Sequence, residues 1–316
     1  MLAMSVAQAT RIEIALTQHA LGRLKAKYYA WAGLMFSMQQ IRLDSSDASS
    51  SQEDTLSFCG IRKGQKESLE ELFHERPIGD GYFSCELEDE ERRLNVNALT
   101  LENVNVFIAL FEALEIDQNT AQTIAFSIAD WEDPDHVPND PSYGAEDEYY
   151  SGLDQPFKCK NAPLDSLEEL FLVRGMTPEI FEKIEPSLTI FPRQGFLFVN
   201  INTASEKVLH ALAAAVAGSA TNTTEGDVDS LVAKILDYRG ADEDFQGRRE
   251  DWFTQFQQRL NAKEQAIFLT LNRYWTFKSD YFRVESEGAA GPRKVSVNLE
   301  AIIERASLSM AALKMR

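Results

Sequence analysis

The sequence predicts an α+β protein in which a large all-helical domain is inserted between the strands of an antiparallel sheet. A helical pattern opens the chain, strand-like alternation follows it and returns near the C-terminus, and the residues between these strand groups are almost all helical in pattern. Because unpaired strands leave exposed hydrogen-bonding edges, the two groups should pair in one sheet. We therefore expect residues 1–97 and 272–316 to form one domain and residues 98–271 to form the inserted helical domain.

The N-terminal region predicts one long amphipathic helix, because apolar residues recur every three or four positions from Ile12 to about Leu43. The residues before it, MLAMSVAQA, run into this helix without a capping residue. For this reason we expect these apolar residues to be the end of a membrane anchor. The anchor would have to be longer than this segment, because no stretch of the sequence reaches the roughly 20 apolar residues that span a bilayer. The apolar face from Ile12 to Leu24 exceeds what a small sheet can cover and should meet helices of partner proteins.

The strands of the sheet are expected on both sides of the insertion. Early strands are predicted at Leu56–Ile61, Tyr82–Leu87 and Arg93–Asn97, with a helical segment near Glu67–His74. Near the C-terminus, the runs TFKSDYFRVESEG and RKVSVNLEAIIE alternate in polarity and predict two antiparallel strands joined around Gly288–Pro292.

The cysteines leave the redox compartment open. Cys59 and Cys85 lie in two of the predicted strands and would form a disulfide if those strands pair, which would suit an oxidising compartment. Two buried free thiols fit the same sequence, and Cys159 has no predicted partner because none of the three lies in a metal-binding Cys motif.

The inserted domain is predicted to be helical from Leu101 to about Leu271, and N-capping residues mark the starts of several of its helices. Thr177 before Pro178 is expected to cap one helix, since proline is favoured at the first helical position. Thr203 with Glu206 has the spacing of a capping box for a later helix.

An acidic segment within this domain is the strongest candidate for a functional site. Residues 130–154 contain nine Asp or Glu and no Lys or Arg, and three prolines prevent a helix from spacing these acids apart. Such a density of carboxylates calls for a hard cation, and an oxygen-rich flexible loop suits calcium. The candidate ligands are Asp130, Asp133, Asp135, Asp140, Glu146 and Asp147.

The sequence leaves both the geometry and the existence of this site open. The segment lacks the glycine and the alternating acids of an EF-hand loop, so the spacing does not say which carboxylates coordinate. A solvated acidic loop is the alternative interpretation. Four aromatic residues in the run favour an ordered segment, because disordered acidic tails contain few aromatics; they are Trp131, Tyr143, Tyr149 and Tyr150.

Two other classes of function are weaker alternatives. The segments LEELFLVRGMTPEIFEKI and VNINTASEKVLHAL resemble helix-hairpin-helix units that bind nucleic acid, but a net charge of −19 opposes binding to a phosphate backbone. Paired acids could also serve a carboxylate-based hydrolase such as a glycosidase. The four histidines are scattered and no GxSxG, P-loop or HExxH motif is present, so we do not expect an enzyme.

A series of sequence blocks resembles one known family, the minor pseudopilin K of the bacterial type II secretion system, also called general secretion pathway protein K. The blocks occur in the order GYFS from Gly81, RLNVN from Arg93, DWEDPD from Asp130, GAEDEYY from Gly144, KNAPLDSLEELFLVRGM from Lys160, NINTASEKVL from Asn200 and SDYFRVESEG from Ser279.

The resemblance implies a pilin-like fold, with a long N-terminal helix packed on an antiparallel sheet and a large helical insertion. It also implies an inner-membrane anchor, a chain mostly in the periplasm, and a non-enzymatic role at the pseudopilus tip with the minor pseudopilins I and J. Finally, it implies structural calcium in the insertion. The positions that match the family blocks and are expected near calcium are Asp130, Asp133, Asp135, Glu146 and Asp147.

Overall fold

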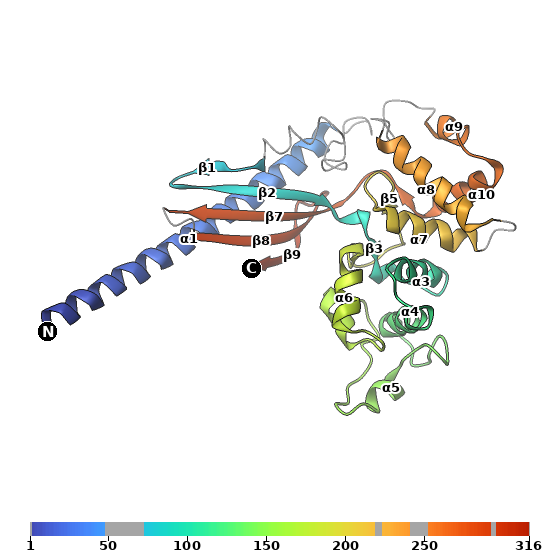
Figure 1. Ribbon diagram of the computed structural model, residues 1–316, viewed down its shortest axis with the longest axis horizontal. Coiled ribbons are helices and arrows are strands. Elements are labelled where there is room, and N and C mark those ends of the chain that lie inside the picture. Colours follow the sequence, from blue (N-terminus) through green and yellow to red (C-terminus); the bar gives the residue numbers. More distant parts are fainter. Residues whose placement is uncertain (1, 48–72, 219–222, 241–251, 292–294, 316) are drawn as a thin grey trace. The chain divides into compact units, whose positions relative to one another are not determined.

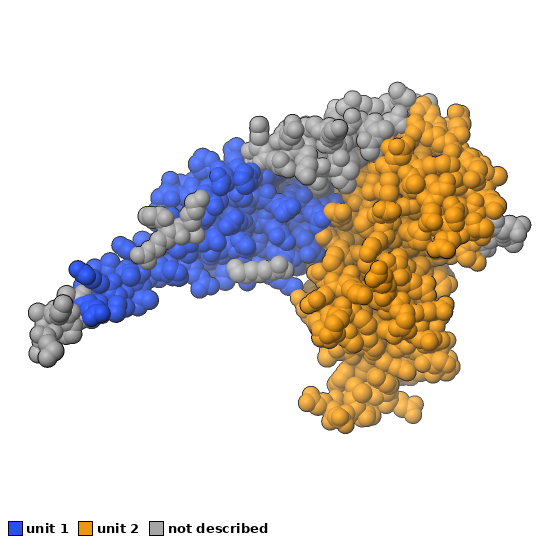
Figure 2. Space-filling model, in the orientation of Figure 1, with its two compact units in different colours: residues 1–89, 280–316 blue, residues 90–279 orange. Residues whose placement is uncertain are grey.

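The computed structural model describes residues 2–47, 73–218, 223–240, 252–291 and 295–315. The chain divides into two compact units, residues 1–89 with 280–316 and residues 90–279 (Figure 2). The predicted strand at residues 56–61, residues 67–72 of the predicted helical segment, and Cys59 all lie outside the described residues. The possible Cys59–Cys85 disulfide therefore stays a prediction.

In its described residues, the first unit consists of one long helix and an antiparallel sheet of five strands (Figure 1). The sheet has the order β1-β2-β7-β8-β9. The elements are α1 (Leu2–Asp47), β1 (Arg76–Ile78), β2 (Gly81–Asp89), β7 (Tyr281–Ala290), β8 (Val295–Glu304) and β9 (Met310–Met315). The register of β2 on β7 runs from Gly81 opposite Ala290 to Asp89 opposite Phe282, which confirms that early and late strands pair.

Glycine and small residues let α1 lie close against the sheet. A Cβ at Gly288, in β7, would lie 2.1 Å from the carbonyl oxygen of Ala26 in α1, so only glycine fits there. Gly288 was expected in the turn between the last two strands, but it lies within β7 and serves helix packing. The apolar core between helix and sheet includes Leu34, Ile41 and Phe282. Burial of these side chains holds α1 on the sheet.

The N-terminal part of α1 extends beyond the sheet (Figure 1). Apolar side chains in the N-terminal half of α1 are largely exposed, with Ile12 at 56%, Leu16 at 65% and Leu24 at 51%. Across the described part of the chain, every helix is too short or too polar to cross a bilayer.

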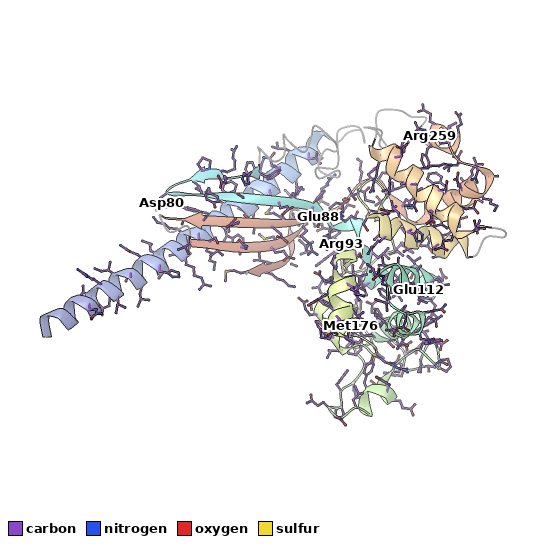
Figure 3. The ribbon with its side chains drawn as sticks, in the orientation of Figure 1. Asp80, Glu88, Arg93, Glu112, Met176 and Arg259 are labelled. Atoms are coloured by element: carbon purple, nitrogen blue, oxygen red, sulfur yellow. The ribbon has the colours of Figure 1, made fainter. Side chains whose placement is uncertain are left out.

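The turn between β1 and β2 also contacts the helix. Asp80, labelled in Figure 3, accepts hydrogen bonds of 2.7 Å from the Lys25 ammonium and from the Tyr29 hydroxyl of α1. These groups are exposed, and such surface pairs contribute little to stability. They fix the position of the turn rather than the fold.

The second unit is mainly helical, and its described residues also form two short parallel ladders. Its α-helices are α3 (Val104–Ala113), α4 (Gln118–Glu132), α5 (Asp147–Ser151), α6 (Pro178–Ile184), α7 (Glu206–Ala217), α8 (Glu225–Gly240), α9 (Trp252–Gln257) and α10 (Ala262–Leu271). Its strands are β3 (Leu94–Asn95), β4 (Leu188–Thr189), β5 (Val199–Asn200) and β6 (Trp275–Thr276), and its 3₁₀ turns include η2 (Glu90–Arg92), η3 (Val96–Ala98), η4 (Leu167–Leu172), η5 (Glu185–Ser187) and η6 (Asn272–Tyr274).

The two ladders explain where the units divide. The sequence places RLNVN, residues 93–97, with the sheet, but β3 pairs in parallel with β4 inside the second unit. In the same way β6, expected on the sheet side of the boundary, pairs in parallel with β5. The boundaries between the units in the sequence therefore fall at residues 89/90 and 279/280 rather than at the predicted 97/98 and 271/272.

Helix starts in the second unit follow the capping rules. The Thr177 hydroxyl accepts the Ile180 N–H at 3.3 Å and Pro178 takes the first position of α6, as predicted. In contrast, α7 is capped by Ser205, whose hydroxyl accepts the Val208 N–H, so the predicted capping box at Thr203 was wrong by two residues.

Candidate metal centre

Helix α4 positions the first two carboxylates of the candidate site. Asp130 and Asp133 are three residues apart and so lie on one helix face. The helix ends at Glu132, with Asp133 as its C-cap, because Pro134 disfavours a helical conformation at the residue before it. Carboxylates at this end face the negative pole of the helix dipole, which makes a nearby cation favourable.

The loop after α4 folds back onto these two carboxylates. Asp130 Oδ1 accepts the Asn139 N–H at 2.8 Å, and Asp130 Oδ2 accepts the Ala145 N–H at 2.6 Å. The Asn139 side-chain amide donates to Asp133 Oδ2 at 2.7 Å. These bonds turn the loop back toward the end of α4, so the residue after Ala145 lies close to that helix end.

That residue is Glu146, which completes a group of three acids. One carboxylate oxygen from each of Asp130, Asp133 and Glu146 lies within 4.8 Å of the others. Asp130 is 0% exposed and Glu146 is 1% exposed. Neither oxygen of Glu146 has a hydrogen-bond partner within the part of the chain that the structure describes. A buried acceptor without a partner is costly, and a cation beside Glu146 would satisfy these oxygens.

The electrostatics of the three acids support the same interpretation. Burial, together with the charges of Asp130 and Asp133, raises the pKa of Glu146 to about 7. Burial also raises the pKa of Asp130, and the N–H groups of Asn139 and Ala145 offset this only in part. Like charges packed together disfavour ionisation, and a cation between them would reverse that preference.

The donor set fits a calcium ion. All three groups offer carboxylate oxygens, which are the ligands that hard cations prefer. Oxygens that lie within 4.8 Å of one another are no more than about twice the Ca–O distance of roughly 2.4 Å apart, so small side-chain shifts would bring all three into contact with one calcium ion. Asp130, Asp133 and Glu146 would hold the ion, and the ion would neutralise their charge.

The other predicted ligands lie nearby but have different contacts. Asp135 Oδ1 accepts the Val137 N–H at 2.8 Å, and Asp140 Oδ1 accepts the Ser142 N–H at 2.8 Å. Asp147 Oδ1 accepts the Cys159 N–H at 2.9 Å, and its Oδ2 lies 3.7 Å from the His136 ring. These carboxylates shape the turns around the site, and none of them belongs to the group of three.

The acidic segment is an ordered part of the second unit. Trp131, Tyr150 and Phe157 pack against one another, with ring centroids 5.1–6.1 Å apart. Tyr150 is fully buried. Two of the four aromatic residues that favoured order in the sequence, Trp131 and Tyr150, thus form a small core with Phe157.

Two supporting residues escaped the sequence analysis. Asn139 bonds both helix-end carboxylates, and Arg174 reaches the loop from a distant segment, with its Nη1 donating to the Gly144 carbonyl at 2.8 Å. An asparagine among clustered acids is a weak local signal, whereas nothing local marks Arg174. Arg174 is also one of the few basic residues that a nucleic-acid-binding hairpin could offer here, and it faces the acidic loop instead.

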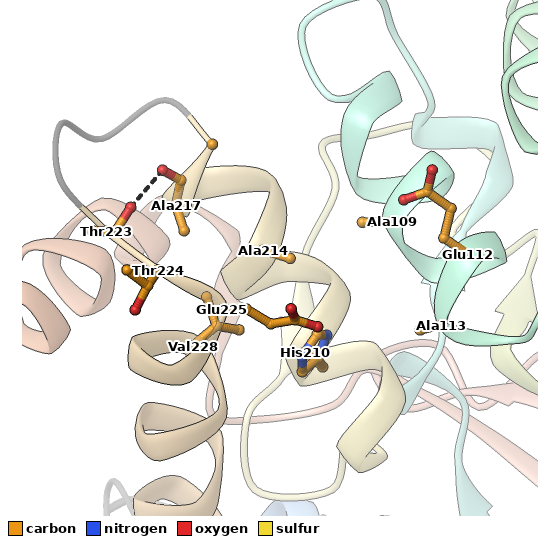
Figure 4. A pocket seen from close by; sticks show the side chains of 11 residues that line it. Ala109, Glu112, Ala113, His210, Ala214, Ala217, Thr223, Thr224, Glu225 and Val228 are labelled. Atoms are coloured by element: carbon orange, nitrogen blue, oxygen red, sulfur yellow. Dashed lines mark hydrogen bonds between the residues drawn. The ribbon is translucent and has the colours of Figure 1, made fainter. Parts of the chain in front are cut away.

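A pocket with a volume of about 430 Å³ lies between α3, α7 and α8 (Figure 4). Its wall includes Glu112, opposite His210 and Glu225 in this view. His210 Nε2 lies 3.0 Å from Asp229 Oδ1, which resembles half of a catalytic triad. The Thr223 hydroxyl donates to the Ala217 carbonyl and the Thr224 hydroxyl donates to Asp227, so both are engaged in local structure rather than activated by the histidine.

Comparison with known proteins covers the same segment. Residues 92–193, which include the acidic loop, match the family model described as type II secretion system (T2SS), protein K. The type II secretion system protein K of Aeromonas hydrophila is 33% identical over 142 residues, which is 40% of this chain and 42% of that protein. The protein K of Pseudomonas aeruginosa is 28% identical over 220 residues, 68% of this chain and 59% of that protein. The resemblance to type II secretion system protein K is confirmed. The chain matches less than two thirds of the length of these curated relatives.

The fold is confirmed by a solved structure. One chain of the crystal structure of the GspK-GspI-GspJ complex from the type 2 secretion system of enterotoxigenic Escherichia coli superposes with a TM-score of 0.68. The match covers 98% of this chain and 99% of that chain at 20% sequence identity. A long N-terminal helix on an antiparallel sheet, interrupted by a helical insertion, is therefore the fold that both chains share.

Proposed function

We propose that this chain is a non-enzymatic minor pseudopilin of a bacterial type II secretion system. In this proposal it assembles with the minor pseudopilins I and J at the tip of the pseudopilus, anchored in the inner membrane with most of the chain in the periplasm. The observation that carries the proposal is the match of residues 92–193 to the protein K family together with the shared fold over 98% of the chain.

The exposed apolar residues of α1 support assembly through helices. Leu16 and Leu24 are half or more exposed on the N-terminal half of α1. A contiguous exposed apolar surface usually marks a protein or membrane contact. The insertion between β2 and β7 adds a bulky helical unit to the pilin-like unit, which would hinder the stacking of a further subunit and suits a position at the tip.

We assign a structural calcium ion to Asp130, Asp133 and Glu146. The two unpartnered oxygens of Glu146 support it most directly. An enzymatic use of the same acids is disfavoured, because Asp130 and Glu146 are 0% and 1% exposed and would not meet a substrate. The ion would stabilise the folded insertion by mass action, since the unfolded chain has no preformed site.

Thermal unfolding with chelator, calcium or magnesium tests the calcium assignment. At about a hundredfold excess of calcium over its dissociation constant, the expected stabilisation is about 3 kcal/mol, or roughly 5–10 °C in melting temperature. Magnesium should give a much smaller shift, because it requires a tighter octahedron. Equal melting temperatures in all three conditions would refute the calcium assignment.

Copurification tests the assembly role separately. The chain should form a soluble complex when mixed with the minor pseudopilins I and J of the same system, and Leu16→Glu with Leu24→Glu should weaken that complex. Because both leucines are exposed, this double variant should melt at an unchanged temperature. A wild-type chain that stays monomeric in that mixture would contradict the proposed partners.

A further inference from the structure

The loop that carries Glu146 is held by a residue from a separate segment. Arg174 lies between η4 and α6, and it contacts the loop at three points. Its Nη1 donates to the Gly144 carbonyl at 2.8 Å, its backbone N–H donates to the Tyr150 hydroxyl at 3.3 Å, and its guanidinium carbon lies 4.9 Å from the centre of the Tyr149 ring. These contacts fall on both sides of Glu146 in the sequence.

One peptide group links Arg174 to the candidate ligands. The carbonyl of Gly144 and the N–H of Ala145 belong to the same peptide, and that N–H donates to Asp130 Oδ2 at 2.6 Å. The guanidinium thus polarises a peptide group that in turn bonds a carboxylate of the site. Hydrogen bonds in such a chain strengthen one another in a buried setting. This peptide group lies one residue before Glu146 and so restricts where the backbone of Glu146 can lie.

The fit around this peptide is tight. A Cβ at Gly144 would lie 2.3 Å from Asp130 Oδ2 and 2.8 Å from the Asp140 carbonyl oxygen. Both distances are shorter than van der Waals contact, so the loop approaches α4 this closely only with glycine at that position. The peptide between Gly144 and Ala145 therefore has little freedom once Arg174 holds it.

We propose that Arg174 is the positioning residue of the calcium site, acting through the Gly144–Ala145 peptide to set the separation of Asp130 and Glu146. This inference rests on the calcium assignment above. Arg174 orders the loop without neutralising the site, because its printed contacts are a carbonyl oxygen, a hydroxyl and an aromatic ring rather than the three carboxylates. The negative charge of Asp130, Asp133 and Glu146 is left for the ion.

Calcium titration by isothermal calorimetry on the whole chain tests this role. We expect Arg174→Met to weaken calcium binding about tenfold or more, as removal of groups that orient metal ligands usually does. Arg174→Lys should be intermediate, because an ammonium can bond the Gly144 carbonyl but cannot also stack on Tyr149. Gly144→Ala should weaken binding by displacing Asp130, while Gly152→Ala, whose Cβ would lie 3.4 Å from its nearest atom, should not.

A matched control separates positioning from simple charge. Arg193 lies in the same unit, is half exposed and pairs with Asp165, which is outside the group of three. Arg193→Met removes the same charge, and losing a positive charge should leave calcium affinity unchanged or slightly tighter. A loss of affinity in Arg174→Met but not in Arg193→Met therefore has the sign that only positioning predicts.

The outcomes of the two proposals are distinguishable. If the wild-type chain gives no calcium binding, the calcium assignment fails and this inference falls with it. If the wild-type chain binds calcium and Arg174→Met binds it within twofold, the calcium assignment stands and the role of Arg174 is refuted. Should Arg174→Met not fold, Arg174→Lys decides, and binding within twofold of wild type would again refute the role. A purely structural Arg174 would lower melting temperature equally in chelator and in calcium, with an unchanged dissociation constant.

Discussion

Two buried glutamates in the second unit have opposite surroundings. Glu264 at the junction of α8 and α10 is 0% exposed, and its carboxylate accepts hydrogen bonds from the Lys234 ammonium at 2.6 and 2.8 Å, the Ser230 hydroxyl at 2.6 Å and the Asn261 N–H at 2.7 Å. Glu146 in the acidic loop is 1% exposed, and among the described residues it has no such partner for either oxygen.

Their pKa values follow these surroundings. Burial alone would raise the pKa of Glu264, but the bonds from Lys234, Ser230 and Asn261 outweigh burial and lower it. Burial raises the pKa of Glu146 to about 7, and the neighbouring acids add to the rise. Among the described residues, the protein thus supplies a cation to Glu264 and none to Glu146, so of these two carboxylates Glu146 is the one that an external ion would stabilise.

Removing the internal cation should have the largest effect on stability. Lys234→Met leaves the Glu264 carboxylate buried without its charge partner, and breaking such a pair costs about 3 kcal/mol. Urea unfolding should show this loss equally in chelator and in calcium, because the junction of α8 and α10 does not contain the three acids of the proposed calcium site. A loss confined to one of the two conditions would contradict the contrast between the two glutamates.

Removing the charge of Glu146 should increase stability in the absence of calcium, which is the opposite of the effect expected for Lys234→Met. Glu146→Gln takes away a charge that burial disfavours, so at about pH 8 in chelator the variant should be more stable than wild type by about 1–3 kcal/mol. In calcium the variant should lose the ion-induced rise in melting temperature. Unfolding curves in both conditions measure the two effects, and destabilisation of the variant in chelator would show that Glu146 is satisfied without an ion.

The pH dependence of wild-type stability sharpens the comparison further. A carboxyl whose pKa rises from 4.5 unfolded to about 7 folded contributes stability that is present below about pH 4.5 and is lost as pH rises through about 7. In chelator, wild-type stability should therefore fall by about 1–2 kcal/mol relative to Glu146→Gln between about pH 5 and pH 8. The calcium-induced rise in melting temperature should grow over the same range, because the ion binds the ionised carboxylates. Parallel pH profiles for the two proteins in chelator would exclude Glu146 as the titrating group.

Much of the fold was predictable because periodicity is a local property. The helix from Ile12 to Leu43 and the late strands followed from apolar spacing, and the structure extends α1 to Leu2–Asp47. In contrast, β9 has the sequence MAALKM, which does not alternate, and it becomes a strand because it pairs with β8. The two-residue ladders of β3 with β4 and β5 with β6 are too short to leave a pattern.

The site was predictable to a lesser degree. The density of acids located the loop, and the proline after Asp133 located the end of α4. Which acids converge depends on how the chain returns, and that is set by Asn139 bonding two carboxylates and by Arg174 holding the Gly144 carbonyl. The first contacts depend on how the loop turns, and the last one joins residues 30 positions apart, so spacing alone ranks Asp147 with Glu146.

Substitution of Asp147 therefore has the smallest predicted effect on stability and calcium affinity, and it tests whether neighbouring acids can be told apart. Its carboxylate is adjacent to Glu146 in sequence, but its Oδ1 accepts the Cys159 N–H and it stands outside the group of three. Asp147→Asn keeps an oxygen acceptor for that N–H, so it should change stability in chelator by no more than about 0.5 kcal/mol. Calcium affinity should fall only slightly, from the loss of one nearby charge. Calorimetric titration of calcium into Asp147→Asn and into Glu146→Gln shows whether calcium affinity depends on the position of each carboxylate or only on the total negative charge of the loop. If calcium affinity falls equally in the two variants, the whole acidic loop, and not Asp130, Asp133 and Glu146 alone, forms the site.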